Sequence, residues 1–477
     1  MSSPQVRCLI DAGFQSQIIL PSDEKYTQRE NTYWSASTRL EPACIVQPKS
    51  AEDVADILKA VIAAQQKFAV RSGGHGSAPG ASNIEDGVTI DLGELNTVSY
   101  DEASGRARLG PGAKWHEVYK YLSQYGRTIA GGRVGDVGVG GLLLGGGKTY
   151  FSARYGFACD SVVSYDIVLA SGEIATVTKD EHEELFRALK GGSNNFGIVT
   201  SFEMDTFPCG PLWGGMMLLA PETIPTVISA MASFTDNIAS DPDASVICLF
   251  THSPDTQGTG AVAYVVHTAG VADAPAFREF AAIPQIANTM KMSSHHELAV
   301  EFGLPGGYYN VWYTITIKNT TRMMQEATRH HENLIQTLKT QIPSGDFITQ
   351  CVFQSLPTLY AEQAEAAGGN IMGVERHTEN GILLLAAAML RTKEQASAAE
   401  PLIRAWCDAL AADVDGVLPW VDLNYANAAQ SPLASYGREA VDRMRRVAAQ
   451  YDPQGVFQTL CPGGFKISSV RDEDIRD

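Results

Sequence analysis

A histidine set among glycines is the side chain in this sequence best placed for covalent chemistry. His75 lies in the segment Arg71-Ser72-Gly73-Gly74-His75-Gly76-Ser77, directly after a stretch that predicts a strand. Adjacent glycines permit positive φ and let successive backbone N–H groups point the same way, which makes a binding site for a phosphate or diphosphate. The imidazole has little bulk around it and can reach a ligand held there. The alternative is a tight surface turn that happens to contain a histidine.

Two further segments are rich in glycine. Residues 131–147 hold too many glycines to be helix or strand throughout, so they predict close approach of the backbone to a flat or phosphorylated ligand, or else a glycine-rich hairpin that packs helices. Their spacing fits a nicotinamide-binding motif only loosely. Residues 191–199 follow a helical pattern that Gly191 could cap, so this segment is either ligand-binding or a simple helix end.

The remaining sequence predicts the elements that hold these segments. Between residues 40 and 207, short strands alternate with helices, one of which Ser50 would cap with Asp53 three residues later. From about 209 to 415, strands alternate with long helices such as 320–340 and 394–411, which predicts an antiparallel sheet covered on one face. A chain of 477 residues exceeds one core, so we expect residues 1–208 and 416–477 to form one lobe around a second, inserted lobe, 209–415.

Composition excludes several classes of protein. A formal charge of −18 repels nucleic acid. The sequence contains no run of about 18 apolar residues, so it predicts no membrane span. The first residues lack the pattern of a secretory signal, and the eight cysteines show no metal spacing, so we expect buried free thiols and a cytoplasmic protein. Two histidine pairs, 295–296 and 330–331, cannot chelate because adjacent side chains point apart. We expect them to be solvated and predict no metal site.

Five motifs occur in an order that is specific to one family. They are "VRSGGHG" at 70–76, "AGGRVGDVGVGGLLLGGG" at 130–147, "RYGFACDSVVSYDIVLASGE" at 154–173, "LFRALKGGSNNFGIVTSFEMDTFP" at 185–208 and "YDPQGVFQTLCPGGFKI" at 451–467. Together they resemble the vanillyl-alcohol oxidase and p-cresol methylhydroxylase (PCMH) superfamily, in its berberine-bridge-enzyme-like branch. The resemblance implies an α+β fold in which a two-lobed PCMH-type FAD-binding domain carries an inserted substrate domain of antiparallel sheet and helices.

The resemblance also implies a cofactor and the residues that bind it. His75 would attach to the 8α-methyl group of FAD, and the backbone from Arg71 to Ser77 would hold the pyrophosphate. Many relatives have a second tether from a cysteine where this chain has Val134, so we expect FAD to be covalent through His75 only; the alternative tether, Cys159, lies in a different motif. The cofactor-binding residues implied are Arg71, Ser72, Gly73, Gly74, His75, Gly76, Ser77, Val134, Gly135, Val137, Gly138, Gly140, Gly141, Asn195, Gly197, Ile198, Val199, Asn424 and Tyr425.

The candidate catalytic residues lie near the C-terminus. Relatives often have Tyr-x-Asn-Tyr where this chain has Asp422-Leu423-Asn424-Tyr425. Tyr425 would be the base or would orient the substrate hydroxyl if a cation or the flavin stabilises its phenolate, or it would only pack on the flavin ring. Asp422 is either a second candidate base or a surface carboxylate. The aromatic cluster of Tyr308, Tyr309, Trp312 and Tyr313 is either sheet core or, at alternate positions, the roof of the pocket.

These features predict an oxidoreductase. Hydride would pass from a C–H bond of an alcohol, an amine or a secondary-metabolite scaffold to FAD, and O2 would reoxidise the flavin to give H2O2. Val137 is small, as in oxygen-reactive relatives, and favours this oxidase. The alternatives are a dehydrogenase or oxidative cyclase, and a non-catalytic flavin-binding protein. The predicted partners are a small-molecule substrate and O2; the sequence leaves the substrate and the oligomeric state open.

Overall fold

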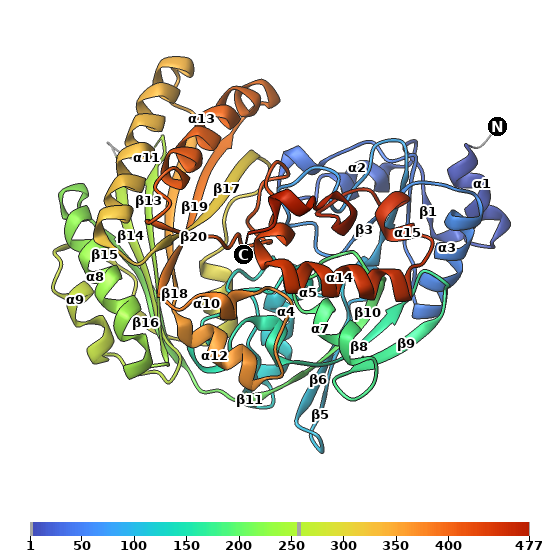
Figure 1. Ribbon diagram of the computed structural model, residues 1–477, viewed down its shortest axis with the longest axis horizontal. Coiled ribbons are helices and arrows are strands. Elements are labelled where there is room, and N and C mark those ends of the chain that lie inside the picture. The colour runs from blue at the N-terminus through green and yellow to red at the C-terminus, as the bar shows by residue number, and fades with distance from the viewer. Residues whose placement is uncertain (1–2, 255–258, 477) are drawn as a thin grey trace.

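The computed structural model describes residues 3–254 and 259–476, and Figure 1 shows them as two lobes side by side. One lobe contains the N-terminal half of the chain and also its C-terminal end. The other lobe is built around a single large sheet that begins at Leu212 and ends at Leu418. The glycine-rich segments belong to the first lobe and face the second, so the contact between the lobes is where a site can form.

The first lobe begins with a four-stranded sheet. In spatial order its strands are β1 (Ile18–Ile19), β2 (Cys44–Val46), β4 (Val88–Asp91) and β3 (Phe68–Arg71), of which β2, β4 and β3 are parallel. Helices α1 (Pro4–Asp11) and α3 (Ala51–Ala63) pack against each other beside it, and α2 (Glu24–Glu30) precedes β2. Helix α3 begins as predicted, because the Ser50 hydroxyl accepts the Asp53 backbone N–H at 3.1 Å.

A second, antiparallel sheet completes this lobe. Its strands, in spatial order, are β5 (Val98–Asp101), β6 (Arg106–Leu109), β10 (Ile198–Asp205), β8 (Val162–Val168) and β9 (Ile174–Thr178), and a separate pair joins β7 (Arg127–Thr128) to β11 (Phe207–Pro208). The helices between them are α4 (Trp115–Ser123), α5 (Val139–Leu144), α6 (Ser152–Tyr155) and α7 (Glu183–Leu189). Glycine loops leave β3 and enter α5 and β10, so the sheets deliver all three loops to one region.

The second lobe is a nine-stranded antiparallel sheet. Its strands are, in spatial order, β15 (Gln285–Asn288), β12 (Leu212–Leu219), β14 (Gly260–His267), β13 (Ala244–His252), β18 (Ile348–Leu356), β19 (Gly381–Leu390), β17 (Tyr309–Lys318) and β20 (Val417–Leu418), with β16 (Lys291–Ser293) also paired to β12. Helices α8 (Ile224–Asn237), α11 (Thr321–Gln341) and α13 (Lys393–Ala411) cover its outer face in Figure 1. The predicted antiparallel sheet with helices on one face is therefore confirmed. Shorter helices in this lobe are α9 (Arg278–Ala281), α10 (His295–Glu301) and α12 (Thr358–Ala366).

Strand β18 lies near the centre of this sheet and was missed by the sequence analysis. Its cavity-side residues are Gln350, Val352 and Gln354, and the intervening side chains face the helices. Two glutamines within nine residues weaken the apolar signal of a buried strand. The sheet face opposite the helices is therefore partly polar. Polar side chains on a buried sheet face indicate a ligand-binding surface.

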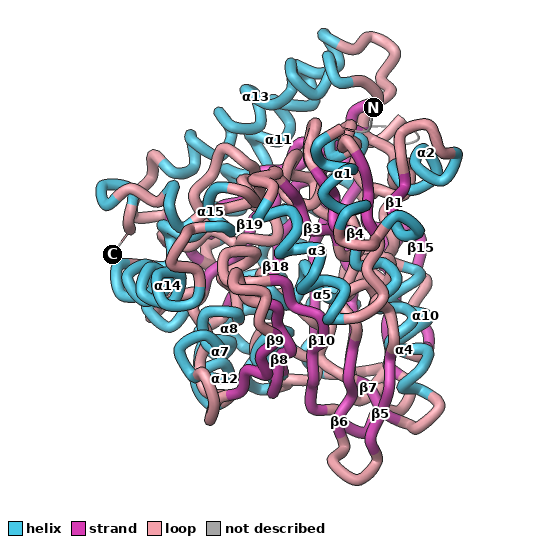
Figure 2. Tube along the Cα trace, turned by 90° about the vertical axis from the view of Figure 1, so that its right-hand side faces the viewer, coloured by secondary structure: helices cyan, strands magenta, loops and turns pink. Residues whose placement is uncertain are grey.

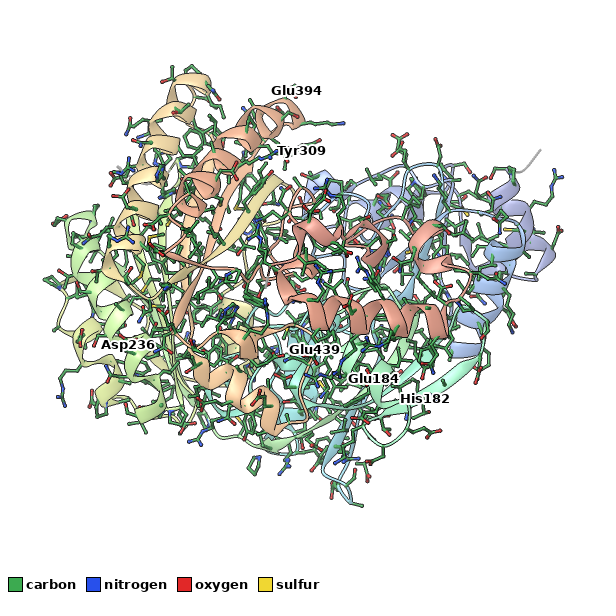
Figure 3. The ribbon with its side chains drawn as sticks, viewed as in Figure 1. His182, Glu184, Asp236, Tyr309, Glu394 and Glu439 are labelled. Atoms are coloured by element: carbon green, nitrogen blue, oxygen red, sulfur yellow. The ribbon has the colours of Figure 1, made fainter. Side chains whose placement is uncertain are left out.

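The C-terminal segment returns to the first lobe as helices α14 (Arg438–Tyr451) and α15 (Val456–Thr459). Figures 1 and 2 both show α14 beside α7. Figure 3 shows Glu184 of α7 and Glu439 of α14 on neighbouring helices, and Arg443 pairs with both, at 3.7 and 3.4 Å. His182 also meets Tyr451, with its Nδ1 3.0 Å from the hydroxyl oxygen.

The expectation that the histidine pairs are solvated is wrong for one member of each. His295 is buried and stacks on the Tyr119 ring at 3.6 Å, and His331 is fully buried with its Nε2 2.8 Å from Thr349 Oγ1. Both side chains are buried where helices pack against neighbouring elements. The polar character of a His-His pair in the sequence does not reveal this burial. Within residues 3–254 and 259–476 no cluster of three or more His, Cys, Asp or Glu is arranged to hold a metal ion.

The eight cysteines are free, and six of them are buried. Cys8 and Cys209 are partly exposed. None of the helices in the described part of the chain has the length and apolar character needed to cross a membrane.

Candidate active site

A cavity of about 400 Å³ lies where the two lobes meet. Its walls come from the loop after β3, the segment before α5, the segment before β10, the inner face of the nine-stranded sheet and the loop after β20. Of the residues predicted from sequence, those that line it are Ser72, Gly73, Gly74, His75, Gly76, Ser77, Val134, Val137, Gly138, Gly140, Gly141, Gly197, Ile198, Val199, Asp422, Asn424 and Tyr425. Segments more than 300 residues apart thus meet at one place.

The first two glycine loops pack backbone against backbone. A Cβ atom on Gly73 would lie 2.5 Å from the Cα atom of Gly138, and one on Gly138 would lie 2.5 Å from the Gly73 nitrogen. The Ser72 hydroxyl holds the same junction by donating to the Pro111 carbonyl. Because real Cβ contacts are never this short, only glycine allows the two loops to form a single cradle.

We expect Gly73→Ala to break this cradle. The added methyl group overpacks the junction and should lower the free energy of unfolding by about 1–3 kcal/mol, together with a loss of bound flavin. Gly76→Ala is the matched control, because a Cβ there meets nothing within 4 Å. Thermal unfolding and the visible absorbance of the purified proteins measure both effects. Equal behaviour of the two variants would show that loop contact does not build the site.

His75 lines the cavity and is held by an aromatic neighbour. The ring of Trp34 stacks on the imidazole, with centroids 4.7 Å apart and an interplanar angle of 16°, and the Trp34 backbone N–H donates to the Gly74 carbonyl at 3.1 Å. Burial lowers the pKa of His75 to about 4, so the imidazole is neutral at neutral pH. A neutral ring nitrogen with a fixed orientation is the form that can make a bond to carbon.

Three of the predicted cofactor residues lie outside the cavity. The guanidinium of Arg71 is buried, donates to the Arg29 carbonyl at 3.0 Å and lies over the Tyr33 ring at 3.6 Å. Gly135 donates its N–H to the Ala299 carbonyl at 2.7 Å, and Asn195 donates to the Gly192 carbonyl at 2.8 Å. The structure places all three where they support the loops, so their part in cofactor binding stays a prediction.

The opposite wall centres on Tyr425 and Arg133. Arg133 Nη2 donates to the Tyr425 hydroxyl at 2.9 Å and also to the side-chain oxygen of Gln354. The ring of Trp312 meets the Tyr425 ring edge to face at 5.8 Å. Tyr425 therefore has a cation at its hydroxyl and a ring held in place by Trp312. A neighbouring cation is what a tyrosine needs in order to act as a base.

Two buried charged groups, Asp422 and Lys148, lie on the same wall. Asp422 is 3% exposed and accepts the Tyr425 backbone N–H at 3.2 Å, so the alternative of a surface carboxylate is wrong. Lys148 is 6% exposed and donates from Nζ to the Ser355 carbonyl. Burial raises the pKa of Asp422 and lowers the pKa of Lys148, because the interior penalises either charge.

The sequence analysis assigned no role to several residues of this wall. They are Arg133, Lys148, Tyr150, Gln350 and Gln354, all of which line the cavity. Arg133 and Lys148 were detectable, since a charged side chain beside glycine has few neighbours to pack against. Gln350 and Gln354 were not, because their strand was missed. Of the aromatic cluster, Trp312 lines the cavity and Tyr313 points away toward Glu400 of α13, which the alternation of a strand explains.

The residues near the second tether position are aliphatic. Val134 and Val137 both line the cavity, whereas Cys159 is fully buried and lies outside its lining. Val134 has no sulfur to offer, and the thiol that lines the cavity, Cys461, belongs to the C-terminal segment and not to this loop. These side chains together with the three glycine loops fit a flavin dinucleotide, whose diphosphate needs backbone N–H groups and whose ring needs a flat apolar slot.

Comparisons with known proteins agree with this geometry. A family model described as an FAD binding domain matches residues 42–178. The FAD-dependent monooxygenase sdcF of Emericella nidulans is 39% identical over 96% of this chain and 97% of its own length. Among solved structures, 6-hydroxy-D-nicotine oxidase from Arthrobacter nicotinovorans superposes with a TM-score of 0.77 at 23% identity, covering 92% of this chain and 96% of its own.

A further solved structure shares the fold. Glucooligosaccharide oxidase from Acremonium strictum carries a 6-S-cysteinyl, 8α-N1-histidyl FAD and has a TM-score of 0.75 at 18% identity, covering 95% of this chain and 98% of its own. The fold and the site define the present protein as an FAD-dependent oxidoreductase. The chain belongs to the same family of FAD-dependent enzymes as its Emericella relative, and its fold is that of the berberine-bridge-enzyme-like, PCMH-type flavoproteins.

Proposed function

We propose that the protein is an oxidase that removes hydride from a C–H bond of a small-molecule alcohol, amine or secondary-metabolite scaffold. When bound, FAD supplies the chemistry of accepting two electrons and passing them to O2 as H2O2. The observation that carries the proposal is the meeting of His75, Val137 and the Arg133–Tyr425 pair around one cavity.

On the cofactor side, the residues of the chain would bind FAD and hold it in one orientation. The loop from Ser72 to Ser77 offers backbone N–H groups to the diphosphate, and Gly138 lets the second loop approach it. His75, neutral and stacked on Trp34, is the residue that would bond to the 8α-carbon. We propose a single tether, because Val134 stands where a second would need a thiolate.

On the substrate side, the chain moves a proton. Tyr425 would take it from the substrate heteroatom, with Arg133 placing positive charge at the phenol oxygen during the transfer. Asp422 holds the Tyr425 backbone N–H and is the second candidate base. The apolar walls from Trp312 and Leu385 exclude water and hold the reacting carbon in position.

The name of the Emericella relative favours a second candidate, a monooxygenase that places one oxygen atom of O2 in the product. Turnover under ¹⁸O2 separates the two. An oxidase forms one H2O2 per product and leaves the product unlabelled, whereas a monooxygenase labels the product and forms no stoichiometric peroxide. A third result, rapid turnover with an artificial electron acceptor and negligible use of O2, would indicate a dehydrogenase or an oxidative cyclase.

We also expect Val137→Leu to slow reoxidation by O2 several-fold while leaving the rate with an artificial acceptor unchanged. The larger side chain fills the cavity beside the reactive edge, so it obstructs O2 more than it obstructs electron transfer at a distance. Stopped-flow absorbance measures both rates. Val134→Leu is the matched control in the same loop; an equal effect of both variants would contradict a specific oxygen path at Val137.

A further inference from the structure

The cavity contains more positive charge than the proposed reaction needs. The charged side chains that line it among the described residues are Arg133, Lys148 and Asp422, two cations and one carboxylate. The whole chain has a formal charge of −18, so the excess of positive charge in the cavity is opposite in sign to the net charge of the protein. Charges taken out of water are retained only where something compensates them.

Lys148 is only partly compensated within the described protein. Its Nζ donates to the Ser355 carbonyl, and the Tyr360 ring of α12 lies 5.5 Å from it, but Lys148 has no ion pair with a carboxylate in the part of the chain that the structure describes. The nearest acidic group is Asp422, whose carboxylate favours the charged form of Lys148 and so offsets one of the two cations. Burial and the neighbouring Arg133 lower the pKa of Lys148, and Asp422 offsets only part of that effect.

Arg133 also keeps donors free. Nη2 is used by Gln354 and Tyr425, while Nε and Nη1 donate to no atom of the described residues. Among the described residues, the side-chain contacts given above for Arg133 and Lys148 are with β18, α12 and Tyr425, and none is with the Gly73–Ser77 loop that would take the diphosphate. Both cations line the cavity, and Arg133 does so at Tyr425, the residue proposed to act on the substrate.

The surfaces beside them are flat and apolar. Leu249, Val352 and Leu385 are paired across three neighbouring strands and all line the cavity, and Trp312 and Phe302 extend this surface. A ligand that fits has a planar, apolar body and a negatively charged oxygen at one end, since a cation and an N–H fork bind such an oxygen far better than a neutral group.

We propose that the substrate of this site is a planar oxyanion, a phenolate, an enolate or a carboxylate, that Arg133 and Lys148 bind by its charged oxygen. The inference rests on the proposed function, because it treats the bound anion as a substrate. Binding of the anion itself can be measured without turnover. Tyr425 would then act on a molecule whose charged end is already fixed by its neighbours.

The test is isothermal titration calorimetry of the flavin-loaded protein at low salt. The probes are 4-nitrophenolate and benzoate, two planar oxyanions of different chemistry, and nitrobenzene, a neutral molecule of similar shape. We expect at least one anion to bind about tenfold or more tightly than nitrobenzene, a difference of about 1.4 kcal/mol. Preference for 4-nitrophenolate assigns a phenol or enol to the substrate, and preference for benzoate assigns a carboxylate.

Charge removal at the two cations is the decisive arm. Lys148→Met and Arg133→Met should each weaken the preferred anion about tenfold or more and leave nitrobenzene unchanged. Lys190→Met is the matched control, because Lys190 is also buried but donates to the Asp160 carbonyl away from the cavity, and it should keep the anion preference. Circular dichroism checks the fold; if Lys148→Met does not fold, Lys148→Arg should fold and retain the preference.

Two results would overturn the proposal. One is wild-type protein that binds nitrobenzene as tightly as both anions. The other is an anion affinity that neither Lys148→Met nor Arg133→Met changes in folded protein. Because the titrations need no turnover, a protein without oxidase activity can still pass them, and an oxidase of neutral substrates fails them.

Discussion

Replacing His75 with alanine is expected to abolish the covalent attachment of FAD completely. Intact mass of the wild type should equal the polypeptide plus one FAD, and that of His75→Ala the polypeptide alone. The glycine cradle formed by Gly73 and Gly138 does not depend on the imidazole, so the variant should still bind FAD reversibly and purify yellow. We expect kcat to fall by about 100-fold, which is the cost of misplacing reacting groups by about 1 Å.

Two controls make this result specific. His182→Ala removes an exposed histidine that touches Tyr451 and not the cavity, and it should keep the full adduct. Cys159→Ser removes the alternative tether and should do the same. A wild-type protein with only the polypeptide mass, or a His75→Ala protein that keeps its flavin through acid precipitation, contradicts the tether at His75 and the single-tether proposal with it.

Tyr425→Phe is expected to lower kcat by about 10²–10⁴-fold with a small change in KM. General acid–base catalysis contributes about that much, and the variant removes the hydroxyl that Arg133 contacts while leaving the ring packed against Trp312. Single-turnover reduction of the flavin without O2 is the measurement, because it isolates the step in which the proton leaves. Tyr436→Phe is the matched control: its hydroxyl is buried, donates to the Gly191 carbonyl at 3.1 Å and lies outside the cavity lining. It should lose about 1 kcal/mol of stability and keep its rate.

An effect of Tyr425→Phe below about tenfold would assign the ring to packing and shift the role of base to Asp422. If Asp422 is the base, the pH dependence of kcat/KM should show it. Burial raises the pKa of this carboxyl, and a base works only when deprotonated, so kcat/KM should be lost as pH falls through a range above that of an ordinary carboxyl. Asp422→Asn should then remove that acid limb, whereas a positioning role for Asp422 lowers the rate and leaves the limb in place.

Local signals were sufficient for much of the cofactor side. Gly73, Gly74 and His75 stand next to one another in the chain, so a single loop was enough to predict that they line a binding site. The Ser50 cap and the long helices were readable for the same reason, because capping and helical periodicity act over a few residues. Arg71 shows the limit of this approach: adjacency places it in the loop, but its side chain turns to Arg29 and Tyr33.

The substrate side was mostly beyond local reading. Gln354 meets Arg133 across 221 residues of sequence, and Tyr425 meets it across 292, so neither pair leaves a pattern in the chain. Buried histidines show the same limit: His295 and His331 look solvated by composition, and only the packing of Tyr119 and Trp406 on them decides otherwise.

The sequence alone determined the family and marked the glycines and the histidine that line the cavity, because these residues are neighbours along the chain. Only the tertiary structure decided which distant side chains join them in lining the cavity. Sheet register brings Gln350, Val352 and Gln354 to the inner face of β18, and burial lowers the pKa of Lys148 and raises the pKa of Asp422. Burial and register are properties of the packed chain as a whole, so no stretch of sequence contains them.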